Sequence, residues 1–397
     1  MLSGKGKFNY AYWILPILVY LITFGFAELL AWIGSCHGWW GYCWSRYDSG
    51  LYLEISEIGH TLFPCGIEQG YAPGSNKWCG NAGWAPFYPF LIYLFHLVSG
   101  LPSSVCGVVL SHSFFIGFLY VSALIIKIQS FKFSNWLTLF ICALCPGGIY
   151  FFSIFPISLL ILLISFIFWS ISIKKFQYSI IPAHLIAISY SSAIIIFFSI
   201  GVYMIYMFLI DWKNKKLFDF WLEIKRQWCL ENSYRAIFLN ILIPGLLGLL
   251  SLYFYDWMVT GRWDAMYMVQ NKYGHLLYSP FKHLEKHYQF FISHINTIEA
   301  WIDFHNIFFF FAMPLLIYVL AKNKNPLTPL LIIYTLIMWY IPFSIGINVS
   351  LYRSIALLAP VMAFINPVGN FKKIVMLAIF GVFYYFLGIL FFQSILH

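Results

Sequence analysis

Long apolar runs recur along the whole chain, and they limit its possible folds more than any other feature. The first lies within "YAYWILPILVYLITFGF", Tyr10 to Phe26, and the last reaches the final residues. Each approaches the roughly 20 residues that a helix needs to cross a bilayer. With 61% hydrophobic residues and a mean hydropathy of +0.80, the chain has more apolar surface than a water-soluble domain can bury. Only helices and closed barrels satisfy the backbone in lipid, and these runs are too long for barrel strands. We therefore predict an all-α polytopic membrane protein.

The distribution of the cations predicts how the chain is oriented in the membrane. The net charge of +9 alone would be compatible with a nucleic-acid partner, but 16 of the 23 Lys and Arg fall in short clusters between apolar runs. This is the positive-inside pattern of cytoplasmic loops, so we expect no nucleic acid. The clusters are Lys5 and Lys7; Lys127 and Lys132; Lys174 and Lys175; Lys213, Lys215, Lys216, Lys225, Arg226 and Arg235; Lys322 and Lys324; and Lys372 and Lys373.

These patterns predict a single transmembrane domain, residues 1–397, with its N-terminus inside. We expect about 10–11 spans. The first apolar stretch is longer than a signal-peptide core and lacks a clear cleavage site, so we interpret it as a retained helix. Two long loops, 34–103 and 257–301, are expected on the exoplasmic side. The predicted helices are 11–33, 104–126, 134–151, 156–173, 178–192, 195–211, 236–256, 303–321, 327–344, 353–369 and 374–395.

One apolar stretch in the first loop is too short to be counted as a span. "FYPFLIYLFHLVSG", residues 87–100, suits an interfacial or re-entrant helix better than a crossing helix. If it crossed, every later loop would change sides, and the cationic clusters would face outward.

The cysteines give independent information on sidedness. Four of the eight lie in the first long loop: Cys36, Cys43, Cys65 and Cys79. Their clustering predicts two disulfides in an oxidising compartment, and Cys36–Cys43 with Cys65–Cys79 is the simplest of three connectivities. The alternatives are four free thiols or a zinc site, although C-x6-C and C-x13-C fit the usual zinc spacing poorly.

Carboxylates gather just after the first predicted helix, in "SRYDSGLYLEISEIGH", although charged residues make up only 9% of the chain. A helix over 49–59 places Leu51, Ile55 and Ile58 on one face and two glutamates, Glu54 and Glu57, on another, which is typical of a membrane-surface helix. Asp48 stands at its start. It fits an N-cap, or a catalytic carboxylate, or both.

The stretch "YDSGLYLEISEIGH" resembles the WDS-x-x-Y-x-x-I-A-x-x-G-Y signature of the PIG-V-like mannosyltransferases, a family that includes the second mannosyltransferase of glycosylphosphatidylinositol-anchor synthesis. The matching residues are Asp48, Ser49, Tyr52, Ile55 and Gly59. Three positions depart from the signature: Tyr47 replaces Trp, Ser56 replaces Ala, and His60 replaces the final Tyr.

Four further blocks follow in the family's order. "NAGWAPFYPFLIYL" is similar to "AFFPLYPLL" through Ala85, Pro86, Tyr88 and Pro89. "CPGGIYFFSIFPIS" resembles "FPTAFFLSAPYSES" but lacks its acid, because Ile157 and Ser158 end the block. "GRWDAMYMVQNKYGHLLYSPF" matches a G…Q…WG…PF loop at Gly261, Gln270, Gly274, Pro280 and Phe281. Finally, "SLYRSIALLAP" carries Arg353 where the family has an Arg before an apolar helix. Only the first two of the five blocks are specific.

The resemblance implies a GT-C-type helical bundle that transfers a hexose, mannose by default, from a polyprenyl-phosphate donor with inversion. It assigns the general base to Asp48. Arg353, or Arg46, would then hold the donor phosphate, since a guanidinium grips phosphate with two donors. Arg353 as a snorkelling residue and Arg46 as a surface charge or an orienter of Asp48 are the alternatives. We expect Asp48 to line the main outer cavity and to face Arg353 across it. Candidate pocket residues are Ser49, Tyr52, Trp84, Tyr88 and Gln270.

No cofactor or metal is expected. His283 and His287 have metal-ligand spacing, but no third ligand is evident. The expected partners are the lipid-linked donor, a glycolipid, glycan or protein acceptor, and membrane lipids; a small membrane subunit is left open. The expected location is a prokaryotic inner membrane, with the endoplasmic reticulum as the alternative. Two other functions remain: a transporter of lipid-linked substrates, which would favour charges at mid-membrane, and a non-catalytic scaffold, which the missing acid near Ile157 would suit.

Overall fold

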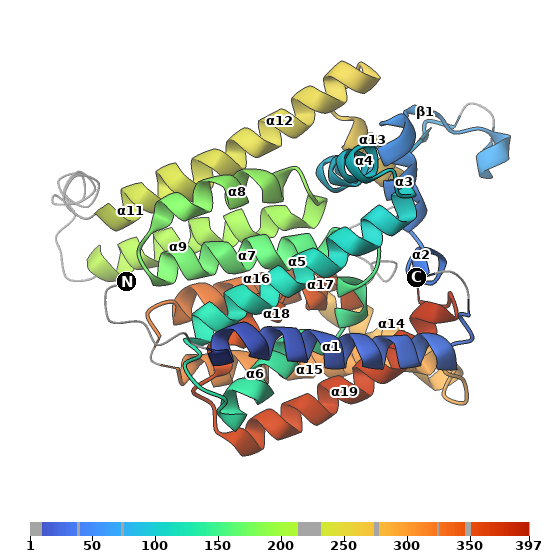
Figure 1. Ribbon diagram of the computed structural model, residues 1–397. Coiled ribbons are helices and arrows are strands. Elements are labelled where there is room, and N and C mark those ends of the chain that lie inside the picture. The colour runs from blue at the N-terminus through green and yellow to red at the C-terminus, as the bar shows by residue number, and fades with distance from the viewer. Residues whose placement is uncertain are drawn as a thin grey trace.

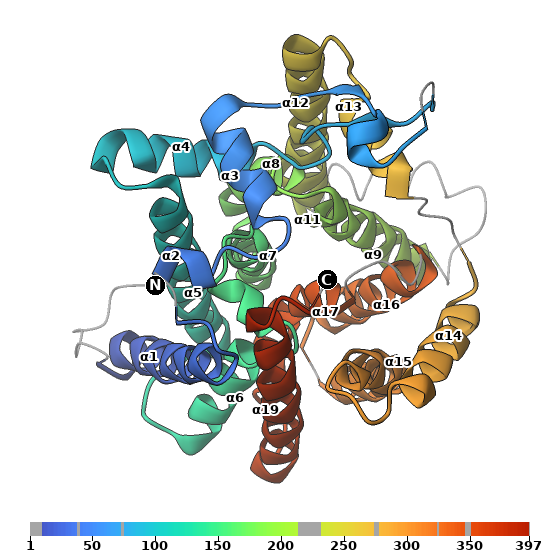
Figure 2. The ribbon, with the colours of Figure 1, turned by 90° about the vertical axis from the view of Figure 1, so that its right-hand side faces the viewer.

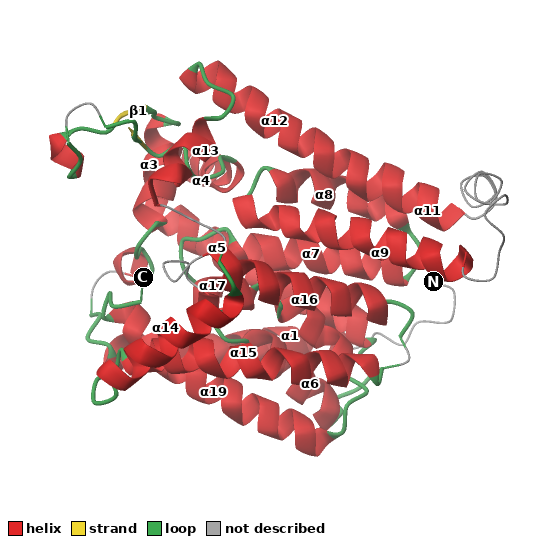
Figure 3. Cartoon of the chain, turned by 180° about the vertical axis from the view of Figure 1, so that it is seen from behind, coloured by secondary structure: helices red, strands yellow, loops and turns green. Residues whose placement is uncertain are grey.

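The computed structural model describes residues 10–37, 40–72, 75–212, 232–273, 278–323, 325–345 and 351–396, and this part of the chain is mostly helical (Figure 3). The two short strands β1 (Phe63–Pro64) and β2 (Trp78–Cys79) pair antiparallel. The helices are α1 (Tyr10–Ile33), α2 (Trp40–Cys43), α3 (Ser49–Ile58), α4 (Phe87–Ser99), α5 (Ser103–Ile126), α6 (Phe133–Ala143), α7 (Ile157–Ser172), α8 (Ile180–Ala187), α9 (Ile194–Trp212), α11 (Asn232–Ile237), α12 (Ile243–Thr260), α13 (Ala265–Gln270), α14 (Pro280–Ser293), α15 (Ala300–Ala321), α16 (Thr328–Ile345), α17 (Leu351–Ala356), α18 (Ala359–Met362) and α19 (Asn370–Phe392).

Within the described residues, six helices are long and apolar enough to cross a membrane: α1, α5, the continuous helix Tyr234–Thr260, α15, α16 and α19. The prediction of an all-α, multi-pass integral membrane protein is therefore confirmed at this level. Five shorter apolar helices accompany them: Phe87–Ser99, Phe133–Ala143, Ile157–Ser172, Ile194–Ile210 and Leu351–Ile365.

The long helices run in one general direction and form a bundle (Figure 1). Helix α1 packs against α5, α6 and α19; α5 packs against α7, and α15 against both α14 and α16. Helices α2, α3, α4 and α13 gather at the end of the bundle opposite the start of α1, and the C-terminus lies there too (Figure 1). We call this the loop end.

Contacts between the two long loops show that both belong to the loop end. Gln270 Nε2 donates a hydrogen bond to the carbonyl oxygen of Gly83 at 2.8 Å, and the Arg262 guanidinium lies 5.5 Å from the ring centre of Trp78. The predicted disulfides, Cys36–Cys43 and Cys65–Cys79, both form, and they close turns within the first loop. The two loops thus share one side of the bundle, as the predicted topology requires.

Helix α4 lies across the bundle instead of along it. It is seen end-on in Figure 1 and lengthwise in Figure 2, where α1 and α15 are seen nearly along their axes. Its 13 residues end at Gly100, whose φ of +67° stops the helix. This direction agrees with the surface helix that was expected for 87–100.

Three predicted helices are shorter or more broken than expected. The helix expected over 134–151 ends at Ala143, because Pro146 and Gly147 follow and Gly147 has a φ of +79°. The helix expected over 178–192 is only Ile180–Ala187, and the chain is extended at Tyr190. The helix expected over 353–369 is divided into α17, α18 and a 3-10 turn, with Pro360 at the start of α18. Apolar composition predicted where these segments lie in the sequence, but it does not indicate where a helix within them ends or is interrupted.

The shared end gives a direct prediction about sidedness. Cysteines placed at the exposed positions Glu57 and Gln289 should both react with a membrane-impermeant maleimide added from outside. A cysteine at Lys127 or Lys174, in the cationic connections after α5 and α7, should react only after the membrane is opened. Reaction at only one of the two loop-end positions would contradict the topology. The native Cys106, Cys142 and Cys145 are buried and should not contribute label.

A buried lysine, Lys373, joins three segments at the end of the bundle opposite the loop end. The Lys373 side chain, at the start of α19, is fully buried. Its Nζ donates to Ser134 Oγ at 2.6 Å and to Asn366 through the carbonyl oxygen at 2.7 Å and Oδ1 at 3.1 Å. Thr138 Oγ1 also donates to Asn366 Oδ1. This network joins α6, the turn after α18 and α19.

Lys373→Met should therefore destabilise the protein by about 2–4 kcal/mol, because it removes a charged donor from its partly buried acceptors on Ser134 and Asn366. Lys372→Met is the matched control, since its side chain is exposed and its loss should change little. Thermal unfolding in detergent, followed by intrinsic fluorescence, compares the two variants. Equal midpoints would show that the network does not stabilise the fold.

Candidate functional site

Asp48 lies at the loop end, in the last turn before α3. Tyr47, directly before it, has a left-handed φ of +54°, which is uncommon for a residue other than glycine. The Ser49 hydroxyl accepts a hydrogen bond from the Arg46 backbone N–H at 3.2 Å and closes this turn. Asp48 itself has helical angles and makes no side-chain cap hydrogen bond. The N-cap interpretation is therefore wrong, and the carboxylate is free for another partner.

That partner is Arg353. Its Nη1 donates to Asp48 Oδ2 at 2.5 Å, across 305 residues of sequence. The Arg353 side chain is 10% exposed and that of Asp48 is 32% exposed, so the pair lies at the edge of the protein interior. The sequence predicted the two residues on opposite sides of a cavity; the structure places them in direct contact.

Aromatic rings surround the guanidinium of Arg353. Its Cζ lies 4.8 Å from the ring centre of Phe155, 5.2 Å from that of Tyr150 and 6.0 Å from that of Tyr47. Such faces attract a cation more strongly where water is excluded. Tyr352 stacks on Tyr150 with ring centres 5.8 Å apart and so helps to hold α17 in place. The snorkelling interpretation of Arg353 is wrong, because its side chain points into the protein.

Three more tyrosines lie within electrostatic reach of Asp48: Tyr52, Tyr190 and Tyr273. Burial chiefly, and the Asp48 carboxylate in addition, raises the pKa of all three phenols. The Arg353 cation opposes this effect at Tyr52 and Tyr190. These side chains are therefore neutral hydrogen-bonding groups at physiological pH, and Asp48 and Arg353 are the charged groups among them.

Arg46 is not the group that orients Asp48. Its Nη2 lies 3.0 Å from Cys36 Sγ, in the first disulfide, and its guanidinium lies 5.1 Å from the ring centre of Tyr42. These contacts hold Arg46 against the Cys36–Cys43 turn.

The predicted pocket residues separate into two groups. Ser49 and Tyr52 are buried close to Asp48, and the Tyr52 ring packs edge-on against Phe155. Tyr88 and Trp84 lie one layer further out: Tyr88 packs edge-on against Tyr52 and donates to the carbonyl oxygen of Gly107 in α5, and Trp84 packs against Tyr273. Gln270 lies away from Asp48 and joins the two loops.

Helix α3 turns one face toward the protein. Ser49, Tyr52, Ile55 and Ser56 are buried, whereas Ile58 is 65% exposed. Of the apolar face expected to meet the membrane, Ile55 is therefore covered by the protein, and Ile58 remains exposed.

Several residues near Asp48 were not found from the sequence. Tyr150 and Phe155 lie in the third matching block, and Tyr352 directly precedes Arg353, so the blocks themselves were the available signal. Tyr190 lies in the connection between α8 and α9, where no sequence pattern marks it.

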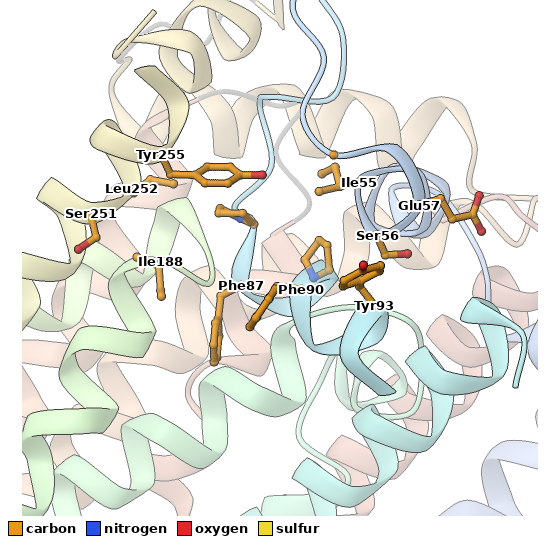
Figure 4. A pocket seen from close by; sticks show the side chains of 13 residues that line it. Ile55, Ser56, Glu57, Phe87, Phe90, Tyr93, Ile188, Ser251, Leu252 and Tyr255 are labelled. Atoms are coloured by element: carbon orange, nitrogen blue, oxygen red, sulfur yellow. The ribbon is translucent and has the colours of Figure 1, made fainter. Parts of the chain in front are cut away.

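A largely apolar cavity of about 680 Å³ lies beside this site. It is bounded by α3, α4, Ile188 and the far part of α12, and Phe87, Phe90 and Tyr255 project into it (Figure 4). Neither Asp48 nor Arg353 lines it. Asp48 therefore does not line this cavity, although Ile55 and Ser56, in the helix that follows Asp48, do.

A second acid–base pair lies behind the cavity wall. His60 Nδ1 and Asp256 Oδ1 are 3.2 Å apart, and both side chains are fully buried. The Tyr255 ring, which lines the cavity, packs edge-on against His60. This pair links the end of α3 to α12 and so fixes the position of one cavity wall.

The two histidines with metal-ligand spacing have separate partners. His283 Nδ1 donates to the carbonyl oxygen of Phe343, and His287 Nδ1 lies 2.8 Å from Asp303 Oδ1. Among the residues that the structure describes, no group of three or more His, Cys, Asp or Glu side chains could hold a metal ion. Gly274 of the fourth block lies outside the described residues.

Comparison with known proteins gives no further assignment: no family model, no curated protein and no solved structure matches the chain.

Proposed function

We propose that this chain is a GT-C-type membrane glycosyltransferase that moves a hexose, mannose by the default of the family it resembles, from a polyprenyl-phosphate donor to an acceptor hydroxyl. The observation that carries the proposal is the Asp48–Arg353 pair. It brings one carboxylate and one guanidinium together at the loop end, among neutral phenols. General-base catalysis and phosphate binding require these two groups.

The proposed chemistry needs both residues. The acceptor oxygen attacks the anomeric carbon of the donor as the bond from that carbon to the phosphate oxygen breaks, which inverts the configuration. Asp48 takes the proton of the acceptor hydroxyl. A carboxylate is a far weaker base than an alkoxide, so the proton moves late, as the new C–O bond forms. The polyprenyl phosphate leaves with the electron pair, and Arg353 stabilises its charge.

The apolar cavity between α3, α4 and α12 supports a lipid-linked substrate. An apolar channel of this kind suits a prenyl chain, because each buried methylene contributes about 0.8 kcal/mol. Helix α3 carries the cavity residue Ile55 two turns after Asp48, so a lipid in the cavity would have its phosphate end within reach of the reaction centre.

The membrane placement follows from the cations. The connections after α5, α7 and α15 and before α19 lie at the end that carries the start of α1 (Figure 1), and they hold Lys127, Lys174, Lys322 and Lys372. The positive-inside rule puts this end in the cytoplasm and the loop end on the exoplasmic side. Within the described residues, six helices are long enough to cross a membrane and five shorter apolar helices accompany them, which supports the GT-C expectation of about 10–11 spans. A prokaryotic inner membrane is the proposed location.

A non-catalytic scaffold is the second candidate. Two observations favour it: the third block lacks the acid of the family pattern, and Asp48 is already neutralised by Arg353. A closed ion pair of this kind would serve a purely structural role equally well.

Transfer of radiolabelled sugar decides between the two candidates. The purified full chain is reconstituted with mannosyl polyprenyl phosphate and, in parallel, the glucosyl donor, together with a membrane lipid extract as the source of acceptor. Donor-dependent formation of a labelled product supports the glycosyltransferase. No product and no consumption of either donor, from a chain that is folded and monodisperse, supports the scaffold.

A further inference from the structure

Arg353 has one acidic partner and unused hydrogen-bonding capacity. A guanidinium has five N–H donors, and the ion pair with Asp48 uses one of them, on Nη1. The phenol groups of Tyr150 and Tyr190 also interact with the guanidinium, and the rings of Phe155 and Tyr150 lie against its faces. Among the residues that the structure describes, the buried Arg353 Nε has no hydrogen-bond partner. The Arg353 guanidinium can therefore bind a second anion, or exchange the Asp48 carboxylate for another anion.

A donor phosphodiester would compete directly with Asp48 for this cation. The carboxylate is planar and the phosphodiester is tetrahedral, but each presents two anionic oxygens that match the guanidinium fork. A carboxylate held by a guanidinium is also a poor base, because its negative charge is already stabilised. Asp48 must leave Arg353 before it can take a proton from an acceptor.

We infer that the Asp48–Arg353 pair is a latch that the donor phosphate opens: the phosphate replaces Asp48 on Arg353, and this exchange releases the base only when the donor is in place. The inference rests on the proposed function. No covalent bond changes in the exchange. One guanidinium–carboxylate hydrogen bond is replaced by a guanidinium–phosphate hydrogen bond, Asp48 stays ionised, and the charge of the site falls from zero to minus one.

The structure lets Asp48 move more easily than Arg353. The Asp48 side chain is one-third exposed and follows Tyr47, whose left-handed backbone is an unfavourable conformation that a small rearrangement could relieve. Arg353 is enclosed by rings and lies on a helix whose neighbour Tyr352 is packed against Gly147. The carboxylate therefore moves, and the cation stays to bind the phosphate. Donor binding must then precede productive binding of the acceptor.

The latch has a consequence that a simple general base lacks: Asp48 opposes donor binding. Asp48→Asn should bind a lipid phosphate about tenfold more tightly than the native chain, because the neutral amide holds the guanidinium less strongly than the carboxylate does and is easier to displace. The same substitution should lower transfer by about 10²–10⁴-fold. Tighter binding together with lost activity distinguishes the latch from a general loss of the site.

Farnesyl phosphate is the probe, because it carries the prenyl chain and the phosphate but no sugar, so the result does not depend on the sugar. Its dissociation constant is measured with the full chain in phosphatidylcholine nanodiscs. Glu54→Gln, which removes a negative charge from the same helix away from the pair, is the matched control and should bind as the native chain does. In Asp48→Asn/Arg353→Gln the gain should disappear, because the cation that it depends on is absent. If Arg353→Gln is not recovered as monodisperse protein, Arg353→Lys replaces it, and the gain should shrink.

The latch is wrong if Asp48→Asn binds farnesyl phosphate as the native chain does, or more weakly. It is also wrong if the double variant gains as much affinity as Asp48→Asn, because a gain without Arg353 would be a general charge effect. Transfer by the native chain is measured in parallel. If the native chain transfers sugar but Asp48→Asn does not bind farnesyl phosphate more tightly, the latch is wrong and the proposed glycosyltransferase function is retained. If the native chain neither transfers sugar nor binds farnesyl phosphate, the proposed function fails, and the latch fails with it.

Discussion

Asp48→Asn should lower sugar transfer by about 10²–10⁴-fold, the usual contribution of a general base. The amide has the size of the carboxylate and can still accept the hydrogen bond of Arg353, but it cannot take the proton of the acceptor. Because the Arg353 side chain is 10% exposed and loses its counter-charge, we expect a loss of stability of about 1–2 kcal/mol. The chain should still fold. Rates are therefore normalised to the amount of monodisperse protein.

Glu54→Gln serves as the activity control for Asp48→Asn. It makes the same chemical change on the same helix, and Glu54 takes no part in the Asp48–Arg353 pair. Transfer should stay within about twofold of the native rate, as is usual for a substitution away from the reacting groups. Near-native transfer by Asp48→Asn would remove Asp48 from the mechanism and leave it as a structural partner of Arg353.

Gly147→Ala should have the largest effect on the fold. Gly147 has a φ of +79°, and a Cβ there would lie 2.1 Å from the carbonyl oxygen of Tyr352. The methyl group would have to displace the backbone of α17 directly before Arg353. We expect a loss of about 4 kcal/mol from the strained backbone and the displaced helix together. Thermal unfolding should show a large fall of the midpoint, or the variant should fail to accumulate.

Gly201→Ala is the control for Gly147→Ala. Gly201 lies inside α9, and a Cβ there meets nothing within 4 Å. Replacing a helical glycine of this kind by alanine should raise the free energy of unfolding by about 0.5–1 kcal/mol. If Gly147→Ala has the same unfolding midpoint as the native chain, the close approach of the Gly147 turn to α17 does not determine the position of Arg353.

The membrane class was predictable because it follows from length and composition alone. Apolar runs report burial in lipid wherever they lie, and the cationic clusters report sidedness without knowledge of the packing. The connectivity Cys36–Cys43 and Cys65–Cys79 was also predictable, since each pair closes a short segment of one loop. Where the helices break was harder to see. The turn after α6 contains Pro146 and Gly147, whereas α8 ends at Ala187 with no Gly or Pro directly after it to mark the end.

The site was predictable one residue at a time, but its geometry was not. The resemblance led us to expect Asp48 and Arg353 on opposite sides of one cavity, but nothing in the sequence indicates a direct contact between two residues 305 positions apart. Asp48 also has the residue type and position of an N-cap, yet a buried guanidinium attracts the carboxylate more strongly than the backbone N–H groups of α3 do. Tyr190 lies in a connection with no periodic pattern, so only the fold could bring it to the site.

The buried polar pairs away from the site show the same limit. In the sequence, His60 is a loop residue and Asp256 is an acid within a predicted helix. Lys373 is one of the positive-inside cations, and Asn366 is a polar residue near a helix end. His60, Asp256 and Lys373 are buried, and each has a polar partner from a distant segment: His60 and Asp256 pair across 196 residues, and Lys373 also donates to Ser134, 239 residues away. Composition describes which residues face lipid or water on average, and it carries no information on which polar groups meet inside the bundle.

The mechanism can be tested by a cryo-electron microscopy structure of the chain with a non-cleavable polyprenyl phosphonate sugar. We expect the phosphonate on the Arg353 guanidinium at about 3 Å, the usual length of such a hydrogen bond. Asp48 should be separated from Arg353 and lie on the opposite face of the anomeric carbon, with the prenyl chain in the cavity between α3, α4 and α12. A phosphonate bound away from Arg353, with the Asp48–Arg353 pair intact, would contradict both the role of Arg353 and the latch.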